Sequence, residues 1–197
     1  PVKRLIYFSS AEVYGESEHN INITEQTAIK PSSYYGLAKF ASEGLLVKTF
    51  NEIKSSLIIL RPPLVYGPGE IESFYGPTGF IRKALKGEEI ILWGQGNELR
   101  EFLYIDDIVK MVEVLIFNSF SGIVNVISGE SRTFKDLIGI IKELNPSLKI
   151  GTQPRSKPKV DQTYSKSFIV KLLPDITFTS LEKGVQIILD YENNNKK

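Results

Sequence analysis

Short runs of apolar residues alternate along the chain with longer segments in which apolar residues recur every three or four positions. A run that is apolar throughout is typical of a strand buried in a parallel sheet, whereas the longer spacing is typical of a helix with one buried face. Alternating strands and helices predict an α/β fold. The pattern predicts strands over residues 3–8, 56–60, 90–93, 102–105 and 123–127, and helices over about 35–51, 80–86, 107–117, 133–144 and 181–191.

The first predicted helix carries a clear apolar stripe. Leu37, Phe40, Ala41 and Leu45 recur with helical spacing, and a Pro-Ser-Ser sequence at 31–33 provides a typical helix start. We therefore expect these four side chains to face the interior of the protein.

Asp106 and Asp107 stand together at the start of the predicted helix over 107–117. Two adjacent carboxylates can act as an acid and base pair. An aspartate just before a helix, however, commonly accepts hydrogen bonds from the free backbone N–H groups of the first turn. We therefore interpret Asp106 as the N-cap of this helix and assign no catalytic role to the pair.

Composition excludes several classes of function. The chain has 197 residues, 42% of them hydrophobic, and its 24 basic and 23 acidic residues are dispersed, which argues against nucleic acid or an anionic membrane as a partner. The chain has no cysteine and one histidine, so no metal site is expected. We interpret the histidine, His19, as a solvated loop residue, because it lies in a polar stretch. No apolar run reaches the roughly 20 residues of a membrane span, so we expect a soluble, cytoplasmic protein.

Tyr35 and Lys39 are one helical turn apart on the same face of the first predicted helix. An ammonium group near a phenol favours the ionised phenolate, which can act as a general base. The strand over 3–8 delivers Ser9 and Ser10 to its carboxyl end, where open α/β sheets bind ligands. The alternative is a chance Tyr and Lys pair and two serines that simply end a strand. The joint position of these residues favours catalysis.

Five ordered motifs in this chain resemble those of the NAD-dependent epimerase/dehydratase family, the extended short-chain dehydrogenase/reductases that modify nucleotide sugars. The resemblance implies the C-terminal part of a Rossmann-like, doubly wound parallel sheet and a smaller α/β substrate-binding region. The motifs are SSAEVYG at 9–15, PSSYYGLAK at 31–39, RPPLVYGPG at 61–69, WGQGNELREFLYIDD at 93–107 and VNVISGE at 124–130.

The resemblance also implies a reaction, the transient oxidation of a sugar at C4 by hydride transfer to NAD. Tyr35 would then be the base, and Ser10 would hold the reacting oxygen. Lys39 would support Tyr35 and hydrogen-bond the nicotinamide ribose, with Ser9, Tyr35 and Pro62 also at the cofactor. NADP stays an alternative to NAD, because the acidic residue that distinguishes them lies in a part of the family fold that this chain lacks.

Two further residues are implied to bind the nucleotide part of the substrate. Arg100 matches an arginine that binds the diphosphate, and its alternative is a surface salt bridge with Glu98 or Glu101. Trp93, the only tryptophan, matches a strand that lines the base pocket, and its alternative is a place in the core.

The sugar and phosphate contacts are less regular. Lys157 is expected to reach a substrate phosphate, with Arg155 as the alternative. Ala11 and Glu12, expected at the substrate, stand where sugar dehydratases carry an Asp-Glu pair, so 4-epimerisation is favoured over dehydration, and decarboxylation of a sugar acid stays open. Leu64 replaces an asparagine that contacts phosphate in many relatives.

No glycine-rich phosphate-binding turn is present, and Gly94-Gln-Gly96 cannot replace it because it opens no helix. We therefore expect this chain to be inactive alone and to pair with a missing N-terminal half, or to form a homodimer through the Tyr35 helix. Two alternatives from other classes are a regulatory relative that binds without catalysis and a decayed or split gene product.

The motifs also suggest a division of the chain. Residues 1–66 are expected to complete the dinucleotide-binding domain with the catalytic residues. Residues 67–192 are expected to form mainly the substrate-binding region, with 101–127 partly returning to the first sheet, and 193–197 to be a disordered tail.

Overall fold

A computed structural model describes residues 2–16, 21–70 and 76–195 of the chain. Its central sheet has three parallel strands in the order β1-β2-β6, namely β1 (Arg4–Phe8), β2 (Ser56–Arg61) and β6 (Gly122–Asn125). Phe8 pairs with Leu60, and Leu60 pairs with Val124. The carboxyl ends of the three strands therefore lie together at one edge of the sheet, just before Ser9, Pro62 and Val126.

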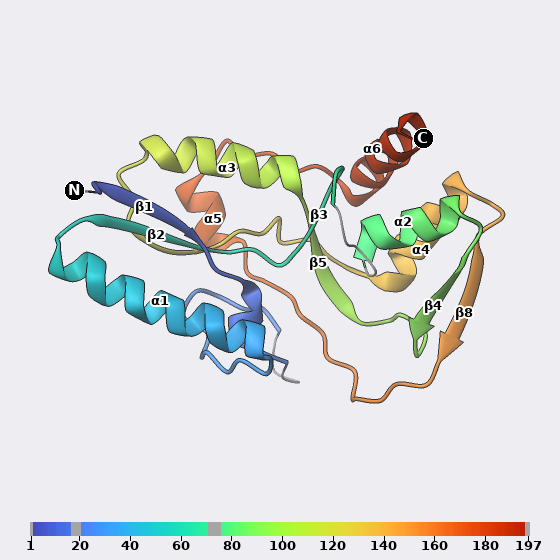
Figure 1. Cartoon of the computed structure of the whole chain (residues 1–197), viewed down its shortest axis with the longest axis horizontal. Helices are drawn as coiled ribbons and strands as arrows, with labels where there is room; N and C mark the ends of the chain where they lie inside the picture. Colours follow the sequence, from blue (N-terminus) through green and yellow to red (C-terminus); the bar gives the residue numbers. More distant parts are fainter. Residues whose placement is uncertain (1, 17–20, 71–75, 196–197) are drawn as a thin grey trace.

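Helices cover both faces of this sheet, as expected for parallel strands. Helix α1 (Tyr34–Glu52) lies on one face, and α3 (Ile105–Phe117) and α5 (Ser167–Leu172) lie on the other (Figure 1). Fully buried side chains from β2, α3, β6 and α5 form one apolar cluster under α3 and α5. This arrangement confirms the α/β, Rossmann-like fold predicted from the sequence.

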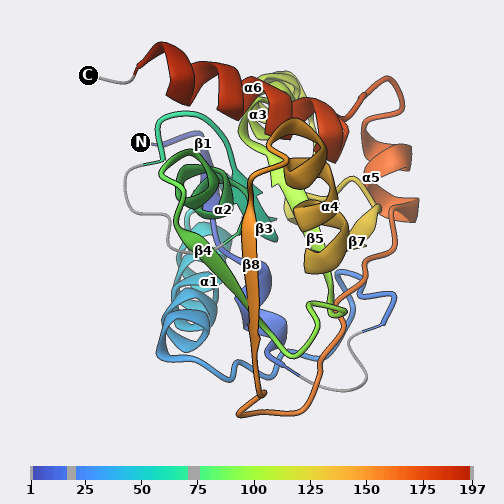
Figure 2. The same cartoon turned by 90° about the vertical axis from the view of Figure 1, so that its right-hand side faces the viewer.

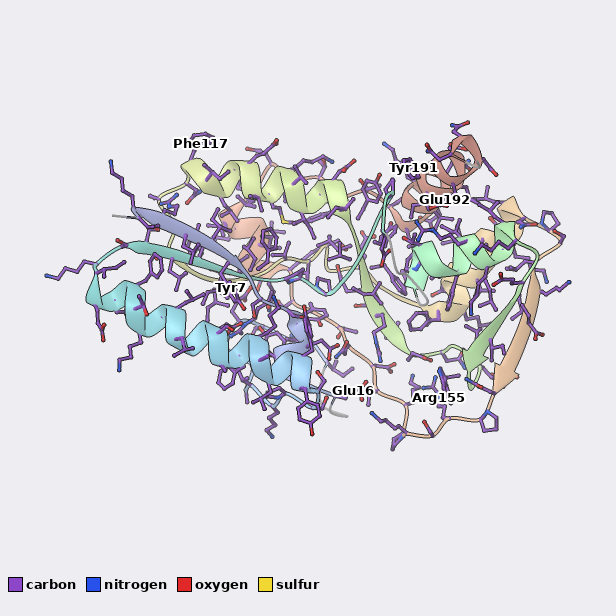
Figure 3. The ribbon with its side chains drawn as sticks, viewed as in Figure 1. Tyr7, Glu16, Phe117, Arg155, Tyr191 and Glu192 are labelled. Atoms are coloured by element: carbon purple, nitrogen blue, oxygen red, sulfur yellow. The ribbon has the colours of Figure 1, made fainter. Side chains whose placement is uncertain are left out.

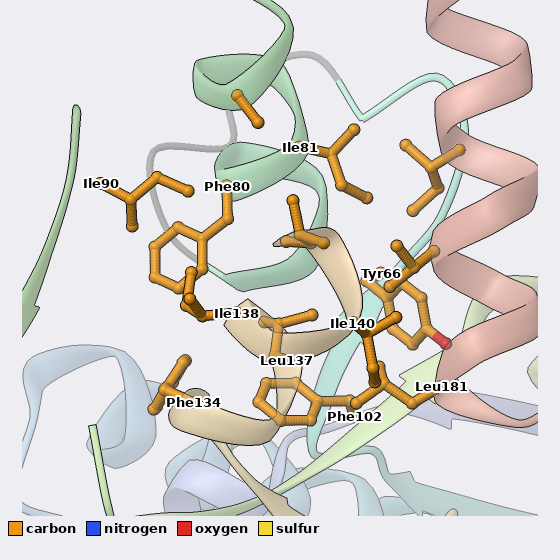
Figure 4. Packing of buried hydrophobic residues seen from close by; sticks show 14 of the residues in the cluster. Tyr66, Phe80, Ile81, Ile90, Phe102, Phe134, Leu137, Ile138, Ile140 and Leu181 are labelled. Carbon is orange, nitrogen blue, oxygen red and sulfur yellow. The ribbon is translucent and has the colours of Figure 1, made fainter. Parts of the chain in front are cut away.

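A second region is built around a two-stranded parallel sheet, β4 (Glu89–Trp93) with β8 (Lys149–Gln153). The helices α2 (Gly76–Leu85), α4 (Phe134–Leu144) and α6 (Leu181–Asn194) pack with it (Figure 2). Their aromatic and aliphatic side chains meet in a separate core cluster, shown in Figure 4. Burial of apolar surface at roughly 25 cal/mol per Å² is what holds each cluster together.

A third sheet joins the two regions. It contains β3 (Leu64–Tyr66), β5 (Leu99–Tyr104) and β7 (Ser131–Thr133), in the order β3-β5-β7. Strand β5 pairs in parallel with β3, which follows the central sheet, and antiparallel with β7, which leads into α4. Residues 99–104 therefore connect the two regions through backbone pairing with β3 and β7.

The predicted apolar stripe of α1 does not face the interior, and this prediction was wrong. Leu45 is 70% exposed and Leu37 52%, and Phe40 and Ala41 are also exposed. The buried residues of the helix are Gly36, Glu43 and Phe50. The face that docks on the sheet is therefore partly polar, because it carries the side chains that bind the carboxyl end of β1.

Asp106 is not the N-cap of α3, contrary to the prediction. The helix begins at Ile105 with Tyr104 as its N-cap, and no side chain caps it. Asp107 is fully buried and accepts hydrogen bonds from the backbone N–H (2.7 Å) and the hydroxyl (3.0 Å) of Thr179. Its carboxylate therefore ties α3 to the segment before α6.

Other boundaries differ by a few residues. Helix α6 continues to Asn194, so residues 193 and 194 are helical and not part of the expected tail, and 196–197 lie outside the described residues. Strand β8 was missed because its sequence, KIGTQ, has no apolar run. Strands β3 and β7, helix α5 and the 3-10 helix η1 (Ala11–Tyr14) were also not predicted.

The domain division stays a prediction, although α5, expected in the substrate-binding region, packs in the cluster of the central sheet. Among the described strands, β1 pairs only with β2, so its other edge is unpaired within this part of the chain. Within the described ranges, no helix is both long and apolar enough to span a membrane.

Candidate active site

The loop that follows β1 is fixed by the end of β2. The Ser9 backbone N–H donates to Leu60 O (2.8 Å), and the Ala11 N–H donates to Pro62 O (2.9 Å). Ser10 lies between them with an extended backbone, and its hydroxyl accepts a hydrogen bond from the Glu12 N–H (3.1 Å) as the N-cap of η1. The predicted catalytic serine is thus held at the carboxyl end of a central strand.

The first turn of α1 packs directly on η1. The Ser33 hydroxyl caps α1 by accepting from the Gly36 N–H (3.0 Å) and lies 3.5 Å from Glu12 Oε2. A Cβ atom added to Gly36 would lie 2.5 Å from Glu12 O, so only glycine allows this approach. The packing brings Tyr35, on the same turn, next to the loop that carries Ser10.

Lys39 lies between the helix and the strand end. Its Nζ donates to Phe8 O at 2.7 Å and stands 5.7 Å from the Tyr35 ring centroid and 5.2 Å from that of Tyr7, which is labelled in Figure 3. The Tyr35 side chain is 55% exposed. An accessible phenol beside an ammonium group is the arrangement that a tyrosine base requires.

A buried polar network that the sequence did not predict lies behind these residues. The Ser9 hydroxyl donates to Glu43 Oε1 (2.5 Å), and the Arg61 guanidinium donates to both oxygens of Glu43 (2.9 and 2.6 Å). Arg61 also donates to the Tyr14 hydroxyl (3.0 Å), which donates to Asn125 Oδ1 (2.7 Å). The network therefore connects α1, β2, η1 and β6 through side chains that are all buried.

The pKa values of Arg61 and Tyr14 are both shifted in this network. Burial alone lowers the pKa of Arg61, but its hydrogen bonds to Glu43 and Tyr14 raise that pKa overall. Burial raises the pKa of Tyr14, and Arg61 only partly opposes it. Arg61 thus stays a cation, and Tyr14 stays a neutral hydroxyl that can both donate and accept.

The position of Glu43 is one sequence signal for this network. Glu43 lies four residues after Lys39 and eight after Tyr35, so the three residues share one face of the helix. Arg61 gave a comparable signal, since it is a charged residue at the end of an otherwise apolar strand. Neither position identifies its partner without the fold.

A cavity of about 410 Å³ opens beside Ser10. One wall is formed by Ser10, Ala11 and Glu12 and by residues 62–64 after β2, including Pro62 and Leu64. Side chains of β5 and of the segment after β8 also line the cavity, namely Arg100, Glu101, Gln162 and Tyr164. Gln162 and Tyr164 were not predicted from the sequence, because they lie in a segment with no recognisable pattern.

A second cavity of about 200 Å³ continues from the first, and the two share Glu16 and Arg100 as lining residues. Trp93, Arg155 and Lys157 line this second cavity. Trp93 is therefore not a core residue. In Figure 3, Glu16 lies near the start of α1 and Arg155 near the ends of β4 and β8, at opposite sides of this groove.

The three cations of the groove have different partners. Arg100 Nη1 donates to the backbone oxygens of Leu99 (2.8 Å) and Val160 (2.6 Å), and it forms no ion pair with Glu98 or Glu101. Arg155 is paired with the buried Glu98. Lys157 is largely exposed, with its Nζ 3.5 Å from a carboxylate oxygen of Glu16.

Glu101 lies at the junction of the two regions. Its Oε1 accepts hydrogen bonds from the backbone N–H (2.6 Å) and hydroxyl (2.6 Å) of Ser128 and from the Gly129 N–H (2.9 Å). Burial raises the pKa of Glu101, and these hydrogen bonds offset that rise only in part. Within the described ranges, no group of three or more potential ligands could hold a metal ion, and His19 lies outside those ranges.

Comparison with known proteins identifies the family. The model of the NAD dependent epimerase/dehydratase family matches residues 1–126, which include Ser10, Tyr35, Lys39 and Arg100. The chain belongs to this family. The family predicted from the sequence motifs is thereby confirmed.

Two relatives show that the family likeness extends over different reactions. The chain is 32% identical over 154 residues to an ADP-L-glycero-D-manno-heptose-6-epimerase from Brachyspira hyodysenteriae, with 75% of this chain and 48% of the relative covered. It is 30% identical over 125 residues to a dTDP-D-glucose 4,6-dehydratase from Dictyostelium discoideum, with 58% and 29% covered.

A solved structure covers all of the chain. It is the UDP-glucose 4-epimerase of Thermotoga maritima, determined with UDP-glucose, with a TM-score of 0.89 and 26% sequence identity. The match covers 100% of the present chain and 65% of the Thermotoga maritima chain. The chain thus spans about two thirds of that epimerase.

Proposed function

We propose that this chain is the catalytic and substrate-binding portion of an NAD-dependent nucleotide-sugar epimerase. The observation that carries the proposal is the continuous groove from Ser10, past Arg100, to Trp93 and Lys157. A nucleoside diphosphate sugar has three parts in the same order. The sugar would lie beside Ser10 and Tyr35, the diphosphate beside Arg100 and Lys157, and the base beside Trp93.

The residues at the carboxyl end of β1 fit the nicotinamide end of a dinucleotide. The Tyr35 phenol is accessible, and the Lys39 ammonium lies beside it, so both can bind ribose hydroxyl groups. A bound NAD would supply the acceptor for the hydride that leaves C4 of the sugar. Pro62 lines the same cavity, whereas the Ser9 hydroxyl is engaged with Glu43, so contact of Ser9 with the cofactor would use its backbone.

Within this proposal, the chain's own residues orient the sugar and move one proton. Ser10 hydrogen-bonds the reacting sugar hydroxyl, and Tyr35 takes the hydroxyl proton as C4 is oxidised. The base is the phenolate form of Tyr35, and the neighbouring Lys39 ammonium stabilises its negative charge before the proton is transferred. If the same hydride returns to the other face of the C4 ketone, Tyr35 returns the proton to the ketone oxygen, and the net change is inversion at C4.

Dehydration or decarboxylation of a nucleotide sugar is the second candidate. Glu12 lines the sugar end of the groove, where a carboxylate can assist either reaction, and one relative is named as a 4,6-dehydratase. Ala11 at the neighbouring position favours epimerisation, since a methyl group cannot transfer a proton.

The first test is binding. Trp93 is the only tryptophan and lines the base end, so its fluorescence reports ligand there. We expect UDP-glucose or dTDP-glucose to change this emission. Lys157→Met should weaken binding roughly threefold to tenfold, because it removes a charge from the diphosphate position. Lys142→Met, on the exposed side of α4, should leave the affinity unchanged. Failure of both nucleotide sugars to bind would contradict the proposal.

The second test is chemical. In this proposal the described residues would contact the nicotinamide end, and they provide no glycine-rich turn for the diphosphate of NAD, so turnover is expected only when the rest of the dinucleotide site is supplied. Interconversion of UDP-glucose and UDP-galactose in that assembly should be abolished by Tyr35→Phe with nucleotide-sugar affinity retained. Turnover by the chain with NAD alone would contradict the requirement for the rest of the site. Cellular function that survives Tyr35→Phe would favour a regulatory, non-catalytic role.

A further inference from the structure

Tyr164 is held rigidly at the sugar end of the groove. Its backbone forms a bridge with Ile23, in which the Ile23 N–H donates to Thr163 O (2.8 Å) and the Ser165 N–H donates to Ile23 O (2.9 Å). The Tyr164 ring is part of the apolar cluster beneath the central sheet and is only 6% exposed. Neither the backbone nor the ring is therefore free to move away.

The Tyr164 hydroxyl has no hydrogen-bond partner among the described residues. Buried phenols normally have one, because leaving a buried hydroxyl unpaired costs stability. The enclosed side-chain atoms without partners in the described ranges belong to Tyr66, Glu101 and Asn125. Tyr164 is not one of them, so its hydroxyl contacts open space, and the space that Tyr164 lines is the 410 Å³ cavity.

The position of Tyr164 along the groove defines what it can contact. It lines the cavity that contains Ser10 and Pro62, and it does not line the neighbouring cavity that contains Trp93 and Arg155. A ligand atom beside Tyr164 would therefore belong to the sugar of a nucleotide sugar, and not to its base.

The hydroxyl also keeps its proton. Burial raises the pKa of Tyr164 well above its ordinary value, and the nearby charge of Glu101 adds to this rise. Tyr164 therefore differs from Tyr35, which is half-exposed and has a cation beside it. A neutral phenol can donate one hydrogen bond and accept another, which suits a sugar hydroxyl.

We propose that Tyr164 is a specificity-determining residue whose hydroxyl hydrogen-bonds a hydroxyl group of the hexose, in the cavity that Ser10 also lines. This inference rests on the proposed function and adds a residue that distinguishes a nucleotide sugar from a free nucleotide. A sugar that offers no partner at this position leaves a nearly buried hydroxyl unpaired, and is therefore disfavoured.

The test compares Tyr164→Phe, which removes the hydroxyl alone, with Tyr191→Phe, which makes the same change on the exposed side of α6. Affinities for UDP, UDP-glucose, dTDP and dTDP-glucose are measured through Trp93 fluorescence and by calorimetry. We expect Tyr164→Phe to weaken the nucleotide sugars roughly threefold to tenfold and to leave UDP and dTDP unchanged, as one neutral hydrogen bond is lost. Tyr191→Phe should change none of the four affinities.

The outcomes separate this inference from the proposed function. Nucleotide-sugar affinities that are the same in Tyr164→Phe as in the wild type overturn the role of Tyr164 alone. Equal weakening of UDP and UDP-glucose also overturns it, because it would indicate a structural effect on the whole groove. If the wild-type chain binds none of the four ligands, that result contradicts the proposed function and therefore also the role of Tyr164.

Discussion

The two ends of the groove are built in opposite ways. At the proposed sugar end, the candidate catalytic residues rest on buried charges and hydrogen bonds that join α1, β2, η1 and β6. At the nucleotide end, Trp93 and Lys157 are exposed, and the buried Glu98 pairs with Arg155 at that end. Catalysis requires reacting atoms placed to within a fraction of an ångström. Binding of a flexible diphosphate tolerates more movement, so exposed side chains suffice there.

The largest effect that would test this difference is expected from Glu43→Gln. The change leaves the buried Arg61 cation without its carboxylate, which typically costs about 3–5 kcal/mol. The free energy of unfolding, measured with urea, should fall by this order. Glu143→Gln, at an exposed site on α4, should change it by less than about 0.5 kcal/mol. Equal effects of the two substitutions would mean that the buried network does not fix the sugar end.

Two glycines of α1 provide the next test. Gly36→Ala places a methyl group 2.5 Å from Glu12 O, and overpacking of this kind costs about 1–3 kcal/mol. Gly44→Ala has nothing within 4 Å and should stabilise the same helix by up to about 1 kcal/mol. Opposite signs in urea unfolding are the expected result. Destabilisation by both would show that helix propensity and packing against η1 are not separable here.

Glu101, which lies between the two regions, is expected to give an effect on stability that depends on pH. Its pKa is raised from the ordinary value of 4.5, so the folded state holds its proton more tightly than the unfolded state does. The stability from this group is present below pH 4.5 and is lost as pH rises toward the folded pKa, by at most about 1.4 kcal/mol per pH unit.

The matching variant is Glu101→Gln, whose side-chain oxygen can still accept from Ser128 and Gly129. The wild type should lose stability relative to this variant as pH rises from 4.5 in urea titrations at a series of pH values. Parallel stability curves for the two proteins would show that Glu101 is ionised equally in the folded and unfolded states.

Sequence patterns predicted helices and strands best where local signals alone, such as a cap and an apolar face, define the element. Helix α4 has a Thr133 N-cap, a capping box with Asp136 and a buried apolar face, and it was predicted within one residue. The strands β2 and β4 were also recognised from their apolar runs, which are buried along β2 and at the alternate positions Ile90 and Leu92 of β4. In each case, local signals and the final packing agree.

Prediction failed where the partner is distant or outside the chain's own core. The stripe of α1 looked like a core face, yet Leu37 and Leu45 are exposed, because the sheet is met by Lys39 and Glu43 instead. Asp107 resembled part of a helix cap but binds Thr179, which is 72 residues away. Such pairings depend on the tertiary fold, and no local spacing encodes them.

The residues of the candidate site show the same difference between local signals and tertiary contacts. The positions of Ser10, Tyr35, Lys39, Arg100 and Trp93 were anticipated, because they lie in motifs with fixed local spacing, although their roles stay predictions. Tyr164 and Gln162 were not anticipated, because they reach the groove only after the chain has crossed the second region and returned.

The buried pair of Glu43 and Arg61 also limits which substitutions are expected at these two positions during evolution. Replacing either residue alone gives a protein with an unpaired interior charge, which typically lowers stability by about 3–5 kcal/mol. Exchange for an uncharged pair therefore requires two nearly simultaneous changes, at positions 18 residues apart. The two codons are consequently expected to change together or not at all.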